Sequence, residues 1–493
     1  MSESVILKSD AIKLIARGQA VVEARQDGID AKVLSVSASV YARPTEIFAG
    51  EARYSGKVRF DTLVYADGKI ECISSVAEFS DKITSPDITA AMTPVIVAEI
   101  ANVEAVKSDG VLKTVAVVDT ALYAGARCEA ECAGSLEDGI FAETKTVEYM
   151  TVVCEATDTA YISDSVSDVK AVEVVGTSSR VVVTGEECAD GEIKISGAVY
   201  TDVILKSDDG LINSQRLITP FVKSASAPGV TGECTAFCSC TVADSAATFE
   251  AEEEGGRLEL AITLQMDVKA AARTTAETVT DVFCVDSELD TTANEVVICS
   301  LEPLTTVIDT VDGQLKLDKE KDPADSVLCV TGSFCRISDA RVENGRVYAE
   351  GLVGGDIIYY NAEKNNVDCV AFRLPFSMPL SVTTDGDKVD ISAAVTEVKV
   401  RIRRESVFDI KAEVAFNVRS CRCETVRLIK SVSRGEQISR PDATVVVHIA
   451  RPGETLWQAA RALGCSPDRV NAQNEATAPY RGSERLVNFC GKQ

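Results

Sequence analysis

The feature that most constrains the fold of this chain is a weak internal repeat with a period of about 140 to 155 residues. The pattern Gly-x-Val-x-x-Asp, followed by an apolar run, occurs at Gly56–Asp61, Gly197–Asp202 and Gly351–Asp356. A phenylalanine comes 18, 19 and 20 residues after these aspartates, at Phe79, Phe221 and Phe376. Two matched landmarks at matched separations indicate a duplicated domain.

Within each repeat, β-branched and apolar residues alternate with polar ones, as at 113–118, 257–264 and 388–395. Alternation with period two is typical of half-buried β-strands. Asp-Gly and Asn-Gly pairs, which favour the tight turns of β-hairpins, occur at 67–68, 109–110, 209–210, 312–313 and 344–345. The sequence therefore predicts a mainly β chain made of antiparallel repeat domains of the sandwich type.

The 493 residues are too many for one hydrophobic core. We expect β repeat domains at 1–155, 156–300 and 301–430, a linker at 431–443 and a small domain at 444–490. The charged segment 318–325, which contains a proline, is the best candidate for a linker or long loop between the second and third repeats.

The end of the chain has the signals of a strand, two helices and a second strand. A β-branched run at 445–449 is followed by Thr455, a good N-cap, and then by apolar residues at helical spacing as far as Gly464. Ser466, with a proline directly after it, starts a second short helix towards Asn474. The run 486–489 is left as a closing strand.

This C-terminal module, with Pro-Gly-Glu-Thr-Leu-Trp at 452–457 and Asn474, closely resembles the LysM domain, and the resemblance covers about a tenth of the chain. It implies a βααβ fold and a binding groove between the loop that enters the first helix and the loop after the second. The partner- or glycan-binding positions that follow from it are Gly453, Glu454, Thr455, Leu456, Trp457 and Asn474. Trp457 is the only tryptophan: exposed, it is an anchor for a sugar or a protein, and buried, it is part of the core.

Residue types exclude most catalytic and metal chemistry. His448 is the only histidine and lies in a β run, so histidine-dependent mechanisms and zinc sites with two histidines are not expected. The 17 cysteines include a Cys-x-Cys pair at Cys421 and Cys423 but no Cys-x-x-Cys, and we interpret them mainly as reduced, structural thiols. A minority role in metal binding or late cross-linking stays open. No nucleotide-binding motif occurs, so we expect a protein that is not an enzyme and has no cofactor.

The net charge of −26 is unevenly distributed. Residues 399–493 hold 17 Lys and Arg against 10 Asp and Glu, so the acidity lies in the preceding part of the chain. An acidic body argues against binding to nucleic acid. The basic end is either a weak sign of an acidic partner or chance. The N-terminus lacks the pattern of a secretory signal and no window is apolar enough to span a membrane, so we expect a cytoplasmic location.

Three such β repeats followed by one LysM-like module resemble the SPOCS-domain proteins of spore-forming Clostridia. The resemblance implies a scaffold in spore coat assembly, in the mother cell at the forespore surface, that tethers the basement layer of the coat. In that family the LysM domain is the implied contact to SpoIVA, the ATPase that builds this layer. The alternative is a protein that binds peptidoglycan, or another N-acetylglucosamine polymer, through the LysM-like module.

The repeated aspartates have two interpretations. Asp61, Asp202 and Asp356 could share a function as carboxylates, but we expect each one to cap a turn or to bond backbone amides at a fixed point of its repeat.

Overall fold

The computed structural model describes residues 4–134, 136–208, 210–251, 255–318, 323–404, 406–438 and 444–489. This part of the chain is mainly β, as the alternating pattern predicted. The first repeat contains β1 (Ser4–Asp27), β2 (Lys32–Phe48), β3 (Glu51–Ala66), β4 (Lys69–Thr84), β5 (Val95–Ser108) and β6 (Val111–Ala133). The second contains β7 (Ile140–Val166), β8 (Glu173–Ala189), β9 (Glu192–Lys206), β10 (Ile212–Ser226), β11 (Thr235–Ala251) and β12 (Gly256–Cys284).

The third repeat contains β13 (Ser287–Leu301), β14 (Thr305–Lys316), β15 (Ser326–Glu343), β16 (Arg346–Asn361), β17 (Asn366–Thr383), β18 (Lys388–Arg404) and β19 (Val407–Gln437). The C-terminal module contains β20 (Val445–Ile449), α1 (Leu456–Leu463), α2 (Pro467–Gln473) and β21 (Arg485–Phe489).

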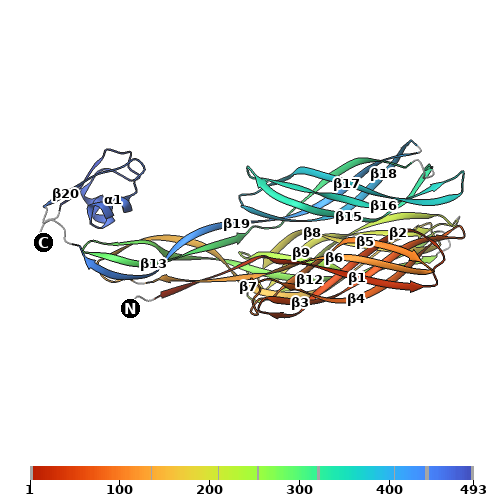
Figure 1. Ribbon diagram of the computed structural model, residues 1–493, viewed down its shortest axis with the longest axis horizontal. Helices are drawn as coiled ribbons and strands as arrows, with labels where there is room; N and C mark the ends of the chain where they lie inside the picture. The colour runs from red at the N-terminus through yellow and green to blue at the C-terminus, as the bar shows by residue number, and fades with distance from the viewer. Residues whose placement is uncertain are drawn as a thin grey trace.

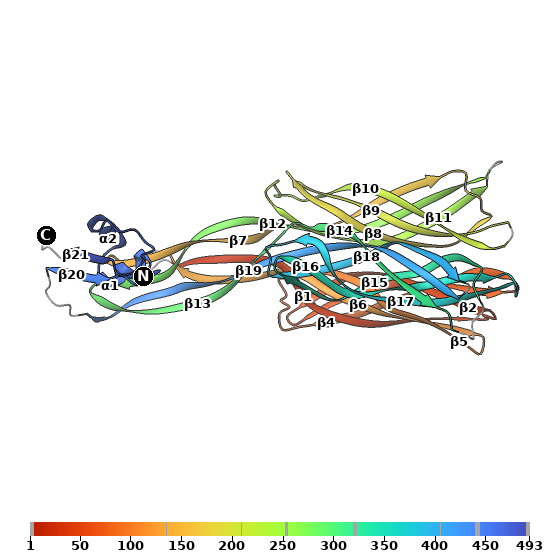
Figure 2. The same cartoon turned by 90° about the horizontal axis from the view of Figure 1, so that it is seen from above.

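One topology occurs three times. The meanders β2-β3-β4, β8-β9-β10 and β15-β16-β17 each form a sheet. A second sheet in each repeat is centred on a long strand. Its order is β1-β6-β5 in the first repeat and β7-β12-β11 in the second. In the third repeat β19 is the central strand, with β18 on one side and both β13 and β14 on the other. Each pair of sheets encloses its own hydrophobic core, so each repeat is a sandwich. Figures 1 and 2 show the three sandwiches side by side at one end of the molecule.

The third repeat differs because its first strand is split. β13 pairs with the C-terminal half of β19 and β14 with the N-terminal half, so together they take the place of β1 and of β7. Pro303, which lies in the break, has no N–H to donate to a ladder. The segment 318–325 therefore joins β14 to β15 within the third repeat, and its prediction as a linker between repeats is wrong; its residues 319–322 lie outside the described residues.

The expected domain limits fall within strands. Residues 155 and 156 both lie in β7, and 300 and 301 both lie in β13. The first seven residues of the expected linker at 431–443 continue β19, while 439–443 lie outside the described residues.

The repeated glycines and phenylalanines are partners on neighbouring strands. Gly56 lies opposite Phe79, Gly197 opposite Phe221, and Gly351 opposite Phe376. A Cβ atom added at any of these glycines would come within 3.0 Å of the ring and within 2.4 Å of a backbone oxygen. The motif thus marks a place in each meander where a phenylalanine ring covers the neighbouring strand at a glycine, which has no side chain.

Three of the predicted hairpin turns have both central residues at positive φ: Asp67 and Gly68, Asp109 and Gly110, and Asn344 and Gly345. At the pair 209–210, Gly210 has a φ of 81° in the connection between β9 and β10, while Asp209 lies outside the described residues. The prediction of a turn at 312–313 is wrong, because both residues lie inside β14. A Cβ at Gly313 would lie 2.6 Å from Leu374 Cδ2, so this glycine leaves room for the opposite sheet.

The long strands continue beyond the sandwiches into a narrow extension, which we call the stalk. It consists of three two-stranded ribbons, β1 with β6, β7 with β12, and β13 with β19, in the segments 4–10, 129–133, 140–150, 273–284, 287–299 and 423–437. Their inward side chains form two apolar clusters that together draw on all six strands. The C-terminal module lies at the far end of the stalk (Figure 1).

Candidate functional site

The C-terminal module, residues 445–489, has well-formed caps on both helices. Thr455 Oγ1 accepts a bond from the Gln458 N–H at 3.2 Å, and Gln458 Oε1 accepts one from the Thr455 N–H at 2.9 Å, which is a capping box. Gly464 ends α1 with a φ of 62°. Ser466 accepts the Arg469 N–H at 3.2 Å at the start of α2. β20 and β21 pair antiparallel, so the module has the expected order of strand, helix, helix, strand.

Two of the six predicted binding residues hold the module together. Glu454 is buried, and its carboxylate contacts His448 Nε2 at 2.8 Å and the Arg451 N–H at 2.7 Å. Burial alone would raise the pKa of this carboxyl, but these hydrogen bonds outweigh it and lower the pKa. Asn474 uses its amide to bond the Val470 carbonyl and both the N–H and the carbonyl of Val487, which ties α2 to β21.

The other predicted residues divide into two groups. Gly453 and Thr455 are exposed and Leu456 is partly exposed, so these three remain accessible at the entry to α1. Trp457 is only 8% exposed, which decides between its two interpretations in favour of burial.

Trp457 is buried because it docks on the tip of the stalk. Its ring meets that of Phe283 edge to face, with centroids 4.8 Å apart, and its Nε1–H donates to Asp281 Oδ2 at 2.8 Å. Arg461, one turn further along α1, forms two bonds to the same carboxylate, at 2.9 and 3.1 Å, and one to the Val282 carbonyl at 2.6 Å. The module and the end of β12 therefore share one small core.

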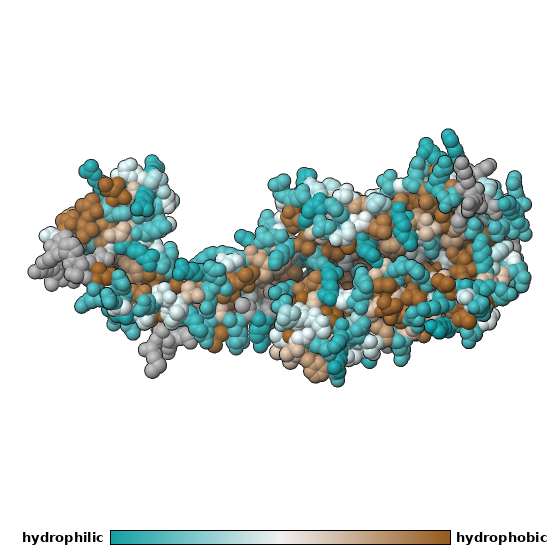
Figure 3. Space-filling view, in the orientation of Figure 1, coloured by the Kyte–Doolittle hydropathy of each residue, from teal (hydrophilic) through white to brown (hydrophobic). Residues whose placement is uncertain are grey.

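The face of the module formed by β20 and β21 is apolar and open. Val445, Val447 and Ile449 alternate along β20 and are 41%, 57% and 63% exposed, and Phe489, which is opposite Val445, is 51% exposed. We call these four residues the apolar strip; Figure 3 shows apolar residues gathered on this end of the molecule. The sequence predicted the strand but not which way it faces. Alternation of apolar residues with a histidine would by itself place the apolar residues in the core; here His448 points inward towards Glu454, so its neighbours point outward.

The repeated aspartates neither cap turns nor bond backbone amides, so that interpretation is wrong. They lie in the middle strand of each meander and bond side chains: Asp61 bonds Arg59 and Ser74, Asp202 bonds Arg180 and Arg216, and Asp356 bonds Ser35 of the first repeat. Arg180 also reaches Ser333 and the Val395 carbonyl of the third repeat. Asp356 directly, and Asp202 through Arg180, therefore help to join the repeats to one another, whereas the bonds of Asp61 stay within the first repeat.

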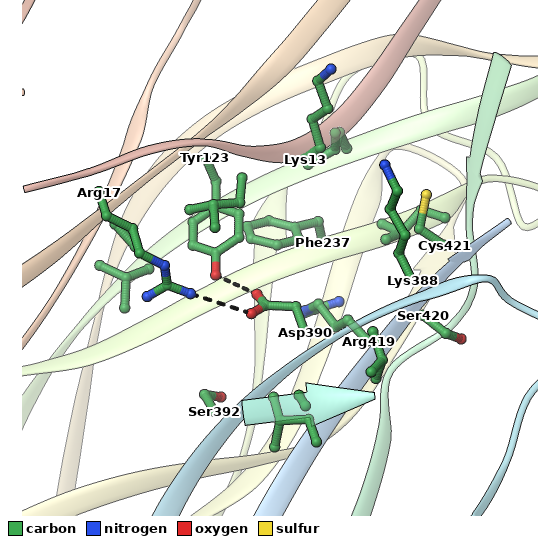
Figure 4. A pocket seen from close by; sticks show the side chains of 18 of the residues that line it. Lys13, Arg17, Tyr123, Phe237, Lys388, Asp390, Ser392, Arg419, Ser420 and Cys421 are labelled. Carbon is green, nitrogen blue, oxygen red and sulfur yellow. Dashed lines mark hydrogen bonds and ion pairs between the residues drawn. The ribbon is translucent and has the colours of Figure 1, made fainter. Parts of the chain in front are cut away.

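A cavity of about 930 Å³ lies where the three repeats meet the stalk. Arg17 and Tyr123 of the first repeat bond Asp390 of the third inside it, and Phe237 of the second repeat packs against Tyr123 (Figure 4). Burial, and then the charge of Asp390, raise the pKa of Tyr123, so this phenol stays protonated at neutral pH. All three repeats line the cavity, which no local sequence motif could indicate.

One pair of cysteines is not reduced. Cys299 of β13 and Cys423 of β19 form a disulfide, so the interpretation of the cysteines as mainly reduced thiols does not hold for these two. The two residues are opposite one another in the ladder but 124 residues apart in sequence, so spacing could not pair them. Cys421, the other member of the Cys-x-Cys pair, has its sulfur 3.6 Å from that of Cys423.

Comparison with known protein families gives a match to part of the chain. The family described as "SipL, SPOCS domain" matches residues 323–403. This segment contains β15 to β18, the meander and the next strand of the third repeat. The match indicates a protein related to sporulation. No curated protein and no solved structure matches the chain. Within the described residues, no helix has the length and apolar character needed to cross a bilayer.

Proposed function

We propose that the protein is a scaffold of endospore coat assembly, without enzymatic activity, which tethers the coat basement layer to the forespore surface. In this proposal all three repeats are SPOCS-like domains, because the strand order of the matched segment recurs in β2 to β5 and in β8 to β11. The C-terminal module is a LysM-like domain that binds a SpoIVA-like ATPase in the mother cell.

The apolar strip is the observation that carries the proposal. A protein surface rarely exposes several large apolar side chains together unless a partner covers them. The strip lies on the module at the far end of the stalk, away from the three sandwiches, where a second protein can approach it (Figure 1). Sugar chains are usually bound by an aromatic ring with polar groups around it, and here Trp457 is occupied by Phe283.

The test is capture of the purified full-length protein by two baits in parallel, the coat basement ATPase of the same organism and insoluble peptidoglycan. We expect capture by the ATPase, and we expect the double substitution Val447→Ser and Ile449→Ser to weaken it at least tenfold. The matched control is Ile218→Ser with Val222→Ser, which removes two apolar residues that are 57% and 58% exposed on β10 and should leave capture unchanged.

Retention on peptidoglycan alone would reject this proposal in favour of the rival function. The accessible residues Gly453, Thr455 and Leu456 would then be the first candidates for the glycan site.

A further inference from the structure

Three cysteine sulfurs converge where the stalk joins the third repeat. Cys299 lies opposite Cys423 on the neighbouring strand, and Cys421 lies two residues before Cys423, on the same face of β19. The Sγ atoms of Cys299, Cys421 and Cys423 all lie within 4.8 Å of one another. Among the described residues this is the one cluster of potential metal ligands that is so compact.

The arrangement of the sulfurs is a triangle rather than a line. Transfer of a disulfide to a third thiol requires the attacking sulfur to lie in line with the bond that breaks. With Cys421 Sγ 3.6 Å from Cys423 Sγ and an ordinary disulfide bond of about 2 Å, a line would place Cys421 Sγ about 5.6 Å from Cys299 Sγ. All three separations are below 4.8 Å, so the geometry is poor for exchange.

The same triangle suits a metal ion. Zinc binds thiolate sulfur at about 2.3 Å, so two sulfurs on a tetrahedral ion are about 3.8 Å apart. The 3.6 Å between Cys421 and Cys423 is close to that edge. Breaking the disulfide would let Cys299 and Cys423 move apart from bonding distance to the same spacing.

The surroundings provide access and charge balance. All three cysteines line the cavity of about 930 Å³ described above, so an ion and a water molecule as fourth ligand can reach them. Lys388 is the ladder partner of Cys421, and Figure 4 shows it beside the sulfur. Lys13 also acts on Cys421 electrostatically, and the carboxylates of Asp387 and Glu302 act in the opposite direction but more weakly. A divalent ion with three thiolates carries a net charge of about −1, which the two ammonium groups offset in part.

We propose that Cys299, Cys421 and Cys423 form a binding site for one thiophilic cation of the Zn²⁺ class, open when the Cys299–Cys423 disulfide is reduced and closed when it is intact. Opening takes two electrons. A dithiol supplies them, and becomes a disulfide itself while its two hydrogens pass to Cys299 and Cys423. Binding then releases the thiol protons to solvent as the sulfurs ligate the ion. The site is independent of the function proposed for the C-terminal module.

The experiment titrates the full-length protein with Co²⁺, whose bonds to thiolate give a charge-transfer absorption in the near ultraviolet. The protein is first reduced with a phosphine, which takes up the oxygen of a water molecule and leaves two thiols. We expect one equivalent of Co²⁺ in the reduced protein, displaced by Zn²⁺, and none in the oxidised protein. Each of the substitutions Cys299→Ser, Cys421→Ser and Cys423→Ser should remove that equivalent.

Cys240→Ser is the matched control, because Cys238 and Cys240 form the same Cys-x-Cys pair on β11 and are not part of the cluster. It should bind Co²⁺ like the parent protein. Cys421→Ser leaves the disulfide intact in the oxidised form, so an unchanged circular dichroism spectrum and disulfide content would show that this variant folds. Absence of the thiolate band in the reduced parent protein, or its persistence in the folded Cys421→Ser variant, would overturn the proposal.

Discussion

At the scale of single residues, the glycines of the repeat motif are fixed by what lies over them. In the second repeat a Cβ at Gly197 would meet the Val182 carbonyl oxygen at 2.3 Å and the Phe221 ring at 2.9 Å. A ring can turn, but a strand backbone within a sandwich cannot move by the ångström that such a contact requires. The motif is therefore a packing requirement rather than a binding signature.

Replacement of this glycine should destabilise the second sandwich. We expect Gly197→Ala to lower the free energy of unfolding by about 1 to 3 kcal/mol, as overpacking does elsewhere. The control is Gly176→Ala on β8, where the nearest atoms to a new Cβ lie 3.8 Å away. The measurement is thermal unfolding followed by circular dichroism, and equal midpoints for the two variants would show that the contact at Gly197 is harmless.

The carboxylate of Glu454 also makes the stability of the C-terminal module depend on pH. Because folding lowers the pKa of Glu454 below its ordinary 4.5, the carboxylate stabilises the module above that pH, and the contribution is lost as the pH falls through the lowered value. Trp457 is the only tryptophan, so its fluorescence reports on this module and its contact with the stalk, and we expect its thermal midpoint to drop below pH 4.5. Glu454→Gln should lower the midpoint at neutral pH and flatten this dependence.

The matched control for that experiment is Glu475→Gln, which changes an exposed carboxyl of the same module. It should keep the midpoint and the pH profile of the parent protein. A profile equally steep in Glu454→Gln would mean that another group is responsible.

Local sequence thus predicted some features of the molecule and missed others for a physical reason. Caps, hairpin turns and strand alternation depend on neighbours within a few residues, so Thr455, Gly464 and Asn344 could be interpreted in advance. The ring over Gly197 and the partners of Asp202 lie on other strands. The sequence therefore shows that the motif repeats, but it does not show which contacts require the glycine and the aspartate. The burial of Trp457 depends on Phe283, more than 170 residues earlier in the chain, and no pattern near residue 457 records it.

At the scale of elements, the split of the first strand at Pro303 hid the third repeat's real start. The sequence shows two short runs where the other repeats have one long strand, and only the pairing of both runs with β19 shows that they are equivalent. The Cys299–Cys423 disulfide fastens the first of these runs to β19 just before the break. The end of β13 is therefore held to β19 by a covalent bond as well as by the ladder.

Loss of this bond should lower the stability of the oxidised protein. The chain-entropy estimate for a loop closed by cysteines that are 124 residues apart is about 5 kcal/mol and is an upper limit. We expect Cys299→Ser to unfold at a lower temperature than the oxidised parent, whereas Cys421→Ser should match the parent. With a chelator and full reduction, the parent and both variants should unfold at the same temperature. A difference that survives reduction would mean that packing around the substituted residue, and not the disulfide, accounts for the loss of stability.

At the scale of the whole molecule, the stalk holds the C-terminal module away from the sandwiches while leaving the apolar strip uncovered. The docking contacts come from α1, through Trp457 and Arg461, and the strip lies on β20 and β21. Docking and partner binding therefore use different faces of one small module. A partner on the strip would be held at a fixed distance from the three sandwiches.

This separation can be tested with Phe283→Ala at the tip of the stalk. The phenyl ring is 5% exposed, and loss of such a ring costs about 3 kcal/mol or more, so the module should undock. Trp457 fluorescence should then shift to longer wavelength and become accessible to acrylamide. Tyr161→Ala, which removes a ring that is 74% exposed on β7, should change neither.

The same variant distinguishes the two possible partner surfaces. If the ATPase binds the apolar strip, Phe283→Ala should capture it as well as the parent protein does, because docking leaves the strip open. If the ATPase binds Trp457 itself, docking competes with capture, and undocking should increase the affinity. An increased affinity in Phe283→Ala would therefore move the binding surface from β20 and β21 to α1 and would make the stalk contact autoinhibitory.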